Sequence, residues 1–196
     1  MSISNLEVAV AERVSHTREL FNNSEAFQIP QIVSAVEHSV RALKNGNKLA
    51  FVGNGGSASE AIHLAAEFTG KCLVDHEPLH AVCLNESQSS LTAIANDYGF
   101  DQVFARQVAA QLKEGDILYA LSTSGQSKNI IRALDVAAER GVRTYLWMGN
   151  FESQVKNVEI WKAPSKTTSR IQELHLSWGH ILAELVELHF PKPQDS

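Results

Sequence analysis

The sequence lacks the marks of membrane, secreted and nucleic-acid-binding proteins. No apolar run approaches the roughly 20 residues that a membrane-spanning helix needs, and the segment 1–21 lacks the basic-then-apolar pattern of a signal peptide. The two cysteines, Cys72 and Cys83, lie in apolar surroundings without a metal-type spacing. Lys and Arg number 17 against 22 Asp and Glu, a net charge of −5, so a broad basic surface is absent. These absences favour a reduced, cytoplasmic protein with no membrane partner and no nucleic-acid partner.

The length of 196 residues predicts one domain, since domains contain about 100–200 residues. Within 1–196, the pattern divides into N-terminal helices at 1–46, an α/β core at 47–190 and a short polar tail at 191–196. No internal repeat or linker interrupts the chain.

Two apolar runs at helical spacing, 6–21 and 32–43, predict two helices in the N-terminal segment. Pro30 precedes the second run, as is typical of a helix start, and Gly46 follows its end. The apolar stripes of these two helices are expected to pack on a partner subunit or against the sheet.

The rest of the chain alternates short apolar runs with helical patterns. This alternation predicts parallel β-α-β units with helices on both faces of the sheet. The predicted strands are 49–52, 80–84, 116–121, 142–147 and 158–161. One helical pattern follows Ser57 and runs to Gly70, and another follows Gly125 and runs to Arg140. Further helical patterns span 88–96, 101–112 and 168–189.

Two strand ends are followed by loops of unusual composition, Gly53–Ser57 and Ser122–Ser127. Glycines allow a ligand close to the backbone, and hydroxyls and free N–H groups at a helix start bind phosphate without a basic side chain. The first loop is neither a Walker A sequence nor a complete dinucleotide fingerprint. Ordinary strand-to-helix turns with Ser caps are the alternative interpretation.

A second set of residues suits metal binding or acid–base chemistry. His63 and Glu67 are four residues apart and share a helix face, whereas Gln172 and His180 lie within one stripe of the closing helix. If the two helices converge, these donors suit zinc or a similar divalent ion, and a Glu facing a His suits proton transfer. The other histidines are interpreted as structural: His16, His38, His76, His80, His175 and His189.

Six motifs in one order resemble the phosphoheptose isomerases, which are sugar isomerase (SIS) domain proteins. The motifs are Gly53–Ala58, His63–Glu67, Leu91–Gly99, Phe104–Gln107, Ser122–Gly125, and Arg170–Glu173 with His180. The resemblance implies a three-layer α/β/α sandwich of the flavodoxin-like SIS type, with a five-stranded parallel sheet. It also implies a homotetramer with sites at subunit interfaces, a bound zinc ion, and conversion of sedoheptulose 7-phosphate to D-glycero-D-manno-heptose 7-phosphate.

The resemblance also assigns roles by position. The phosphate ligands would be Ser57, Ser122, Thr123, Ser124 and Ser127; Asn54, Gly55 and Gly56 would line the same pocket, with Asn96 and Asp97 nearer the sugar. The metal ligands would be His63, Glu67, Gln172 and His180, with Gln172 also counted among the substrate-binding residues. Glu67 and His180 match the family's acid–base pair, in which Glu67 would remove the C1 proton of the open-chain ketose.

Two alternatives remain at this point. A relative with this fold binds the bacterial replication initiator as a tetramer and has lost the catalytic residues, whereas Glu67 and His180 are present here. An isomerase of another ketose phosphate is the second, because the segment 148–154 departs from the family pattern. Smaller departures are Glu60, Lys71 and Ser169.

Overall fold

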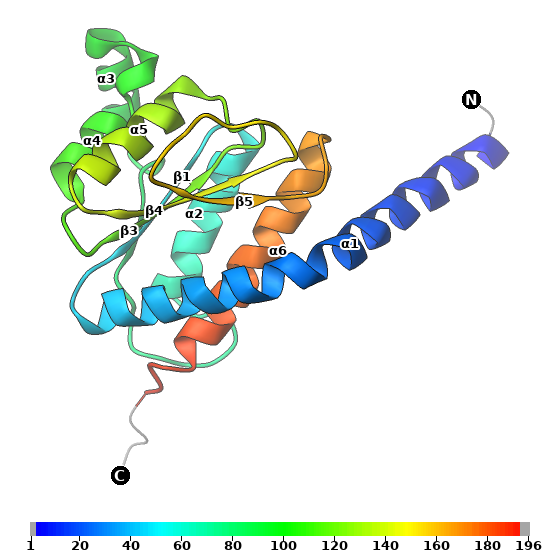
Figure 1. The fold of residues 1–196 in the computed structure, drawn as a ribbon, viewed down its shortest axis with the longest axis horizontal. Coiled ribbons are helices and arrows are strands. Elements are labelled where there is room, and N and C mark those ends of the chain that lie inside the picture. The colour runs from blue at the N-terminus through cyan, green and yellow to red at the C-terminus, as the bar shows by residue number, and fades with distance from the viewer. Residues whose placement is uncertain (1–2, 193–196) are drawn as a thin grey trace.

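The computed structural model describes residues 3–192, and its centre is a five-stranded parallel sheet in the order β2-β1-β3-β4-β5 (Figure 1). This confirms the predicted sheet. Of the predicted tail, only 191 and 192 lie within the described residues. The strands are β1 (Leu49–Gly53), β2 (Ala81–Cys83), β3 (Ile117–Leu121), β4 (Arg143–Met148) and β5 (Glu159–Lys162).

The strand order reverses beside β1. The chain starts the sheet at β1, moves outward to β2, and then crosses back to add β3 on the other side of β1. Parallel pairing sets Gly53 opposite Leu121, so β1 and β3 end at the same level. Such a switch point leaves a crevice beyond the carboxyl ends of the strands, which is where ligands bind in open α/β sheets.

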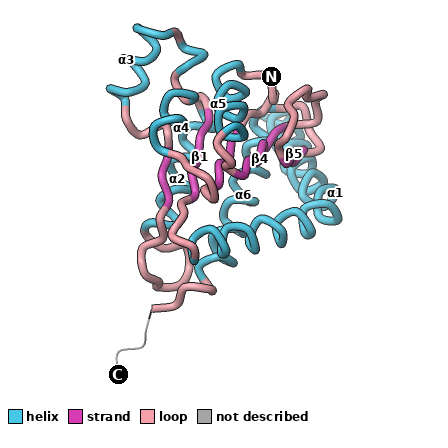
Figure 2. Tube along the Cα trace, turned by 60° about the vertical axis from the view of Figure 1, so that its left-hand side comes forward, coloured by secondary structure: helices cyan, strands magenta, loops and turns pink. Residues whose placement is uncertain are grey.

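Helices cover both faces of the sheet, which confirms the three-layer sandwich (Figures 1 and 2). Side chains alternate between the faces, so that Phe51 points to one hydrophobic core and Val52 to the other. The long helix α1 (Ile3–Lys44) covers the first face together with α2 and α6, and α4 and α5 cover the second. The helices other than α1 are α2 (Gly56–Thr69), α3 (Gln88–Tyr98), the 3-10 helix η1 (Phe100–Gln102), α4 (Ala105–Gln111), α5 (Lys128–Glu139) and α6 (Thr168–Glu187).

The prediction of one helix over 101–112 was wrong. The segment contains η1 and α4, separated by Val103 and Phe104. Both of these side chains are fully buried in the core beneath β1, β3 and β4. Packing of two adjacent apolar residues into this core outweighs the local preference for a continuous helix.

The prediction of two N-terminal helices was also wrong, because α1 is one helix of 42 residues, Ile3–Lys44, with Pro30 inside it. Proline removes one intrahelical hydrogen bond and costs about 3 kcal/mol in a helix interior. Leu20 before the proline and Ile32 after it are buried in the same core. The packing of one continuous helix against this core therefore compensates for the cost of the proline. The N-terminal part of α1 projects away from the sheet (Figure 1). No helix in the described part of the chain is long and apolar enough to cross a membrane.

A cluster of aromatic side chains fills the core between the sheet and α6. The Trp147 and Trp161 rings stack with centroids 5.3 Å apart, and Trp178 meets Trp147 edge-on at 5.8 Å. His175 lies fully buried against Trp147 and Trp178, which fits its structural interpretation. Burial lowers the pKa of His175 from 6.5 to about 3, so the ring is neutral in the folded protein.

We expect this histidine to make stability depend on pH. Below about pH 6.5 only the unfolded chain takes up a proton at His175, so the free energy of unfolding falls as the pH falls toward the folded pKa of about 3. The contribution is about 1.4 kcal/mol per pH unit. Urea denaturation between pH 6 and pH 4 should show a slope smaller by this amount in His175→Phe. Equal slopes in the two proteins would contradict the neutral, buried state.

Candidate active site and metal centre

The first Gly-rich loop connects β1 to α2 in a tight backbone turn. A Cβ on Gly53 would lie 2.3 Å from the Ser57 carbonyl oxygen, so only glycine fits there. Gly55 has a φ of 56°, which glycine adopts readily. The Ser57 side chain is buried at the start of α2. The loop therefore presents backbone and a helix N-terminus to the crevice, as predicted.

The second loop connects β3 to α5 and carries the four hydroxyls. The Ser122 hydroxyl donates to the Ser127 hydroxyl at 3.3 Å, and Ser124 Oγ accepts from the Gln126 backbone N–H at 3.1 Å. The Thr123 carbonyl accepts from the Gly149 N–H at 2.9 Å, which ties the loop to the segment after β4. Because α5 begins at Lys128, its positive dipole end faces this loop.

A pair of side-chain amides, Asn54 and Asn129, joins the two loops. The sequence predicted Asn54 as a site residue but not Asn129. Asn54 and Asn129 exchange two hydrogen bonds, each with an N···O distance of 2.9 Å. Asn129 is 2% exposed and lies in the first turn of α5. The signal available in the sequence was an amide two residues after a Ser-rich loop, at a position that a helix start usually exposes.

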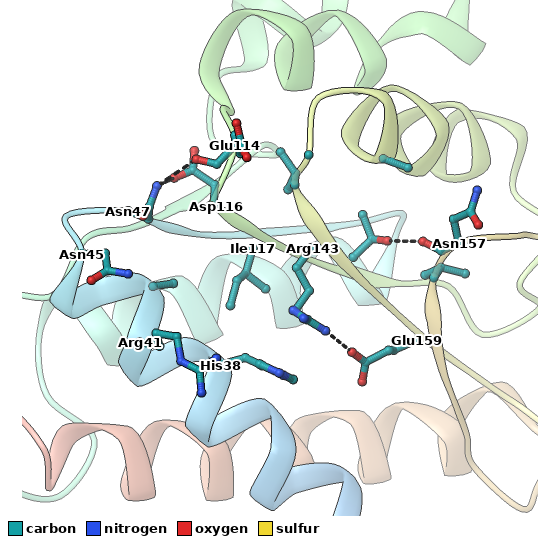
Figure 3. A pocket seen from close by; sticks show the side chains of 17 residues that line it. His38, Arg41, Asn45, Asn47, Glu114, Asp116, Ile117, Arg143, Asn157 and Glu159 are labelled. Atoms are coloured by element: carbon teal, nitrogen blue, oxygen red, sulfur yellow. Dashed lines mark hydrogen bonds and ion pairs between the residues drawn. The ribbon is translucent and has the colours of Figure 1, made fainter.

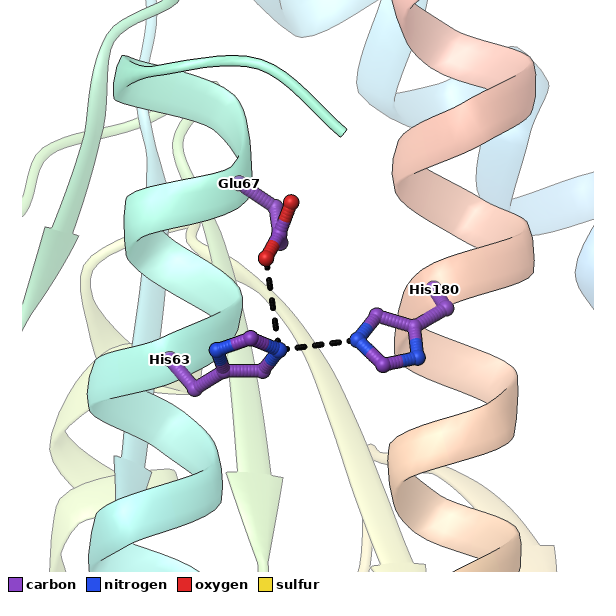
Figure 4. Close-up of side chains that lie close together, drawn as sticks. All are labelled: His63, Glu67 and His180. Carbon is purple, nitrogen blue, oxygen red and sulfur yellow. Dashed lines mark hydrogen bonds and ion pairs between the residues drawn. The ribbon is translucent and has the colours of Figure 1, made fainter. Parts of the chain in front are cut away.

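His63, Glu67 and His180 converge from α2 and α6 (Figure 4). The Nε2 atoms of the two histidines are 2.8 Å apart, and His63 Nε2 is 3.2 Å from Glu67 Oε1. The rings meet edge to face with centroids 5.1 Å apart. The predicted convergence of the two helices is therefore present for these three side chains.

The donor set of these three side chains fits a divalent cation. All three ligand atoms lie within 4.8 Å of one another, and they comprise two imidazole nitrogens and one carboxylate oxygen. In a neutral imidazole one ring nitrogen carries no proton, so both Nε2 atoms can present lone pairs to one point. Two His and one carboxylate form a ligand set of catalytic zinc sites, which keep a further position open.

Gln172 lies nearer the first loop than the histidine pair. Its Nε2 donates to Ser57 Oγ at 3.3 Å, and its side chain packs against Gly56. Gln172 and His180 are eight residues apart, about 12 Å along α6. Its position suits the predicted substrate role, and its role as a metal ligand stays a prediction.

Glu60 is a second carboxyl group near the first loop. Burial raises the pKa of Glu60 to about 7, whereas a hydrogen bond with the Ser57 side chain acts in the opposite direction. In the sequence this residue stands out only as a departure from the family pattern.

Asn96 and Asp97 lie apart from the loops in this chain. They are exposed on α3, where the Asn96 amide donates to the Asp97 carboxylate at 2.7 Å. No described residue of α3 is buried, and the helix projects from the body of the molecule (Figure 1). Their role near the sugar stays a prediction.

A cavity of about 690 Å³ lies at the opposite, amino-terminal ends of β3, β4 and β5 (Figure 3). None of the predicted site residues lines it. Three of its charged side chains are paired: Arg143 with Glu159 at 2.6 Å, and Asp116 with Lys48, which lies outside the lining, at 2.7 Å. The cavity is thus separate from the crevice at the switch point.

The sequence of this chain matches a known protein family. A model of the SIS domain family matches residues 14–146 of this chain. The chain therefore belongs to the SIS domain family, the class that its six motifs resemble.

Individual relatives indicate which group within the SIS domain family the chain is most similar to. The phosphoheptose isomerase of Citrifermentans bemidjiense is 46% identical over 160 residues, which cover 81% of this chain and 83% of that protein. The phosphoheptose isomerase of Helicobacter pylori strain P12 is 40% identical over 181 residues, covering 91% and 94%. The solved structure of phosphoheptose isomerase from Neisseria gonorrhoeae has a TM-score of 0.85 at 35% identity, covering 92% of this chain and 99% of that one. Within the SIS family the chain is a member of the phosphoheptose isomerases, as its motifs predicted.

Proposed function

We propose that the protein converts sedoheptulose 7-phosphate to D-glycero-D-manno-heptose 7-phosphate, a step that supplies heptose for biosynthesis. The observation that carries the proposal is the convergence of Glu67, His63 and His180 on α2 and α6, because α2 begins at the first of the two Ser- and Gly-rich loops at the switch point. The names of the relatives supply the substrate.

The loops and the carboxylate suggest a division of labour. Hydroxyls and backbone N–H groups of Gly53–Ser57 and Ser122–Ser127 bind the phosphate, which explains how a chain of net charge −5 holds an anion. Glu67 removes the proton from C1 of the open-chain ketose, and an enediol forms. His180 donates a proton to the C2 oxygen as the enediol forms and then takes the proton of the C1 hydroxyl, while Glu67 returns its proton to C2, so that the aldose is formed without net gain or loss of protons.

We further propose that the site holds zinc through His63, Glu67 and His180, with Gln172 as a candidate fourth ligand. When bound, zinc stabilises negative charge that develops on the substrate oxygens. The protein positions the donors, since each arises from a helix that is packed on the sheet.

Two other functions are weighed against this one. A protein that only binds the replication initiator has no chemical need for Glu67 and His180. An isomerase of another ketose phosphate is favoured by the segment after β4, whose residues 152–156 line a cavity of about 600 Å³ with Gly125 and Gln126 of the second loop. A panel of ketose phosphates assayed for aldose formation separates these functions.

We infer a homotetramer in a reducing, cytoplasmic compartment. The N-terminal part of α1 supports an oligomer, because Leu6, Val8, Val10 and Val14 are between 49% and 63% exposed. Two free cysteines, Cys72 and Cys83, support the compartment. Burial raises the pKa of both thiols to about 12, so they are poorly reactive.

Replacement of the base tests the activity. Glu67→Gln keeps the volume of the side chain but removes the proton acceptor, so turnover of sedoheptulose 7-phosphate should fall at least about 100-fold. Glu139→Gln, on the far end of α5, is the matched control and should retain wild-type turnover. Near-normal turnover in Glu67→Gln, measured as aldose formation, would refute the assigned role.

Metal analysis tests the zinc proposal. We expect about one zinc per chain in purified protein, reduced to a small fraction in His63→Ala and in His180→Ala because one nitrogen donor is lost. His189→Ala removes an exposed histidine in the turn after α6, and this variant should keep its zinc. Equal zinc content in all four proteins would contradict the ligand assignment.

Light scattering tests the assembly. If the exposed apolar face of α1 packs between subunits, Val10→Lys combined with Val14→Lys should convert the tetramer to smaller species, because buried lysines are costly. Glu12→Lys, at an exposed polar position on the same turns, should leave the tetramer intact. A monomeric wild-type protein would show that this face does not assemble four chains.

A further inference from the structure

Two asparagines hold the first loop from opposite sides. Asn85, which follows β2, accepts the Gly53 N–H at 3.1 Å and donates to the Gly53 carbonyl at 2.9 Å. Asn129, on α5, makes the reciprocal pair with the Asn54 side chain. The first contact anchors the loop to the sheet edge, whereas the second connects it to the other loop.

Asn129 is oriented by a third hydrogen bond. Its Oδ1 accepts from the Ile130 N–H at 2.9 Å as well as from Asn54. The amide is buried, so a missing partner would leave a polar group without water. The orientation of the Asn129 amide is therefore fixed by α5, and the two hydrogen bonds with Asn54 fix the orientation of the Asn54 side chain in turn.

The Asn54–Asn129 pair joins the two loops at a place where no backbone hydrogen bond among the described residues does so. The ladder between β1 and β3 ends at Gly53 and Leu121, and no backbone hydrogen bond among the described residues joins the two loops beyond that point. The Asn54 amide keeps one N–H that the pair does not use. The pair thus fixes both the spacing of the loops and the direction of this remaining donor.

We propose that Asn129 is a positioning residue that acts through Asn54 to hold the two Ser- and Gly-rich loops at the spacing that one phosphate group requires. This inference rests on the proposed function, because that function places the phosphate at these loops. Asn129 itself need not touch the substrate.

A double-mutant cycle tests the link. We expect Asn129→Ala to raise both the KM for sedoheptulose 7-phosphate and the Kd for inorganic phosphate about tenfold, with kcat changed less than about threefold, because binding geometry is lost rather than the base. Asn54→Ala should weaken phosphate binding as well. The double variant should bind phosphate about as weakly as the weaker single variant, since both changes break one pair.

Two further variants separate positioning from stability. Asn129→Asp keeps the volume and the acceptor but loses the donor to Asn54, so it should also weaken phosphate binding, and it serves if the alanine variant does not fold. Ser39→Ala breaks a buried hydrogen bond to Tyr119 away from the loops and should lower the melting temperature without changing the Kd for phosphate.

The outcomes distinguish the inference from the function. Wild-type phosphate affinity in Asn129→Asp and Asn129→Ala, or strictly additive losses in the cycle, would overturn the positioning role. If wild-type protein binds inorganic phosphate and the cycle shows coupling, but sedoheptulose 7-phosphate is not isomerised, the link stands and the proposed function falls. Absence of phosphate binding by the wild-type protein would overturn the link.

Discussion

The parallel pairing of β1 with β3 is the constraint on which the candidate site depends. It brings Gly53 and Leu121 to one level, so that two loops separated by about 65 residues of sequence leave the sheet side by side. β2 lies on the other side of β1, and the reversal of strand order leaves the ends of the two loops uncovered. The loops, the helix N-termini behind them and the amide pair between them all follow from this register.

The cluster of His63, Glu67 and His180 depends on a different contact, the packing of α6 on α2. Gly179 illustrates how close the two helices come, because a Cβ there would lie 2.2 Å from a Leu64 methyl group. Leu64 follows His63, and Gly179 precedes His180, so the closest approach of the helices lies beside the two imidazoles. The chemistry of the site is thus set by a small residue that lets two helices meet. Figure 4 shows the result, with one donor pair on α2 and the third on α6.

The parts of the molecule away from the crevice are the aromatic core, the cavity at the amino-terminal ends of the strands, and α1. The aromatic core around Trp147, Trp161 and Trp178 fixes α6 against β4 and β5, and so holds the helix that carries His180. The cavity at the amino ends of the strands has paired charges and lies at the opposite edge of the sheet. α1 contributes its C-terminal part to the core, whereas the apolar side chains of its N-terminal part remain exposed.

The sequence by itself determined the strand–helix alternation, the composition of the two loops and the His63–Glu67 pair, because these depend on local spacing and on residue type. It misjudged Pro30 and the segment 101–112, where burial on both sides outweighed a local helix-breaking or helix-forming preference. Only the tertiary structure decided that His180 meets His63, that Gln172 lies at Ser57, and that Asn129 links the loops. Those contacts join residues 75 to 117 positions apart, and no local pattern encodes which side chains a folded sheet brings together.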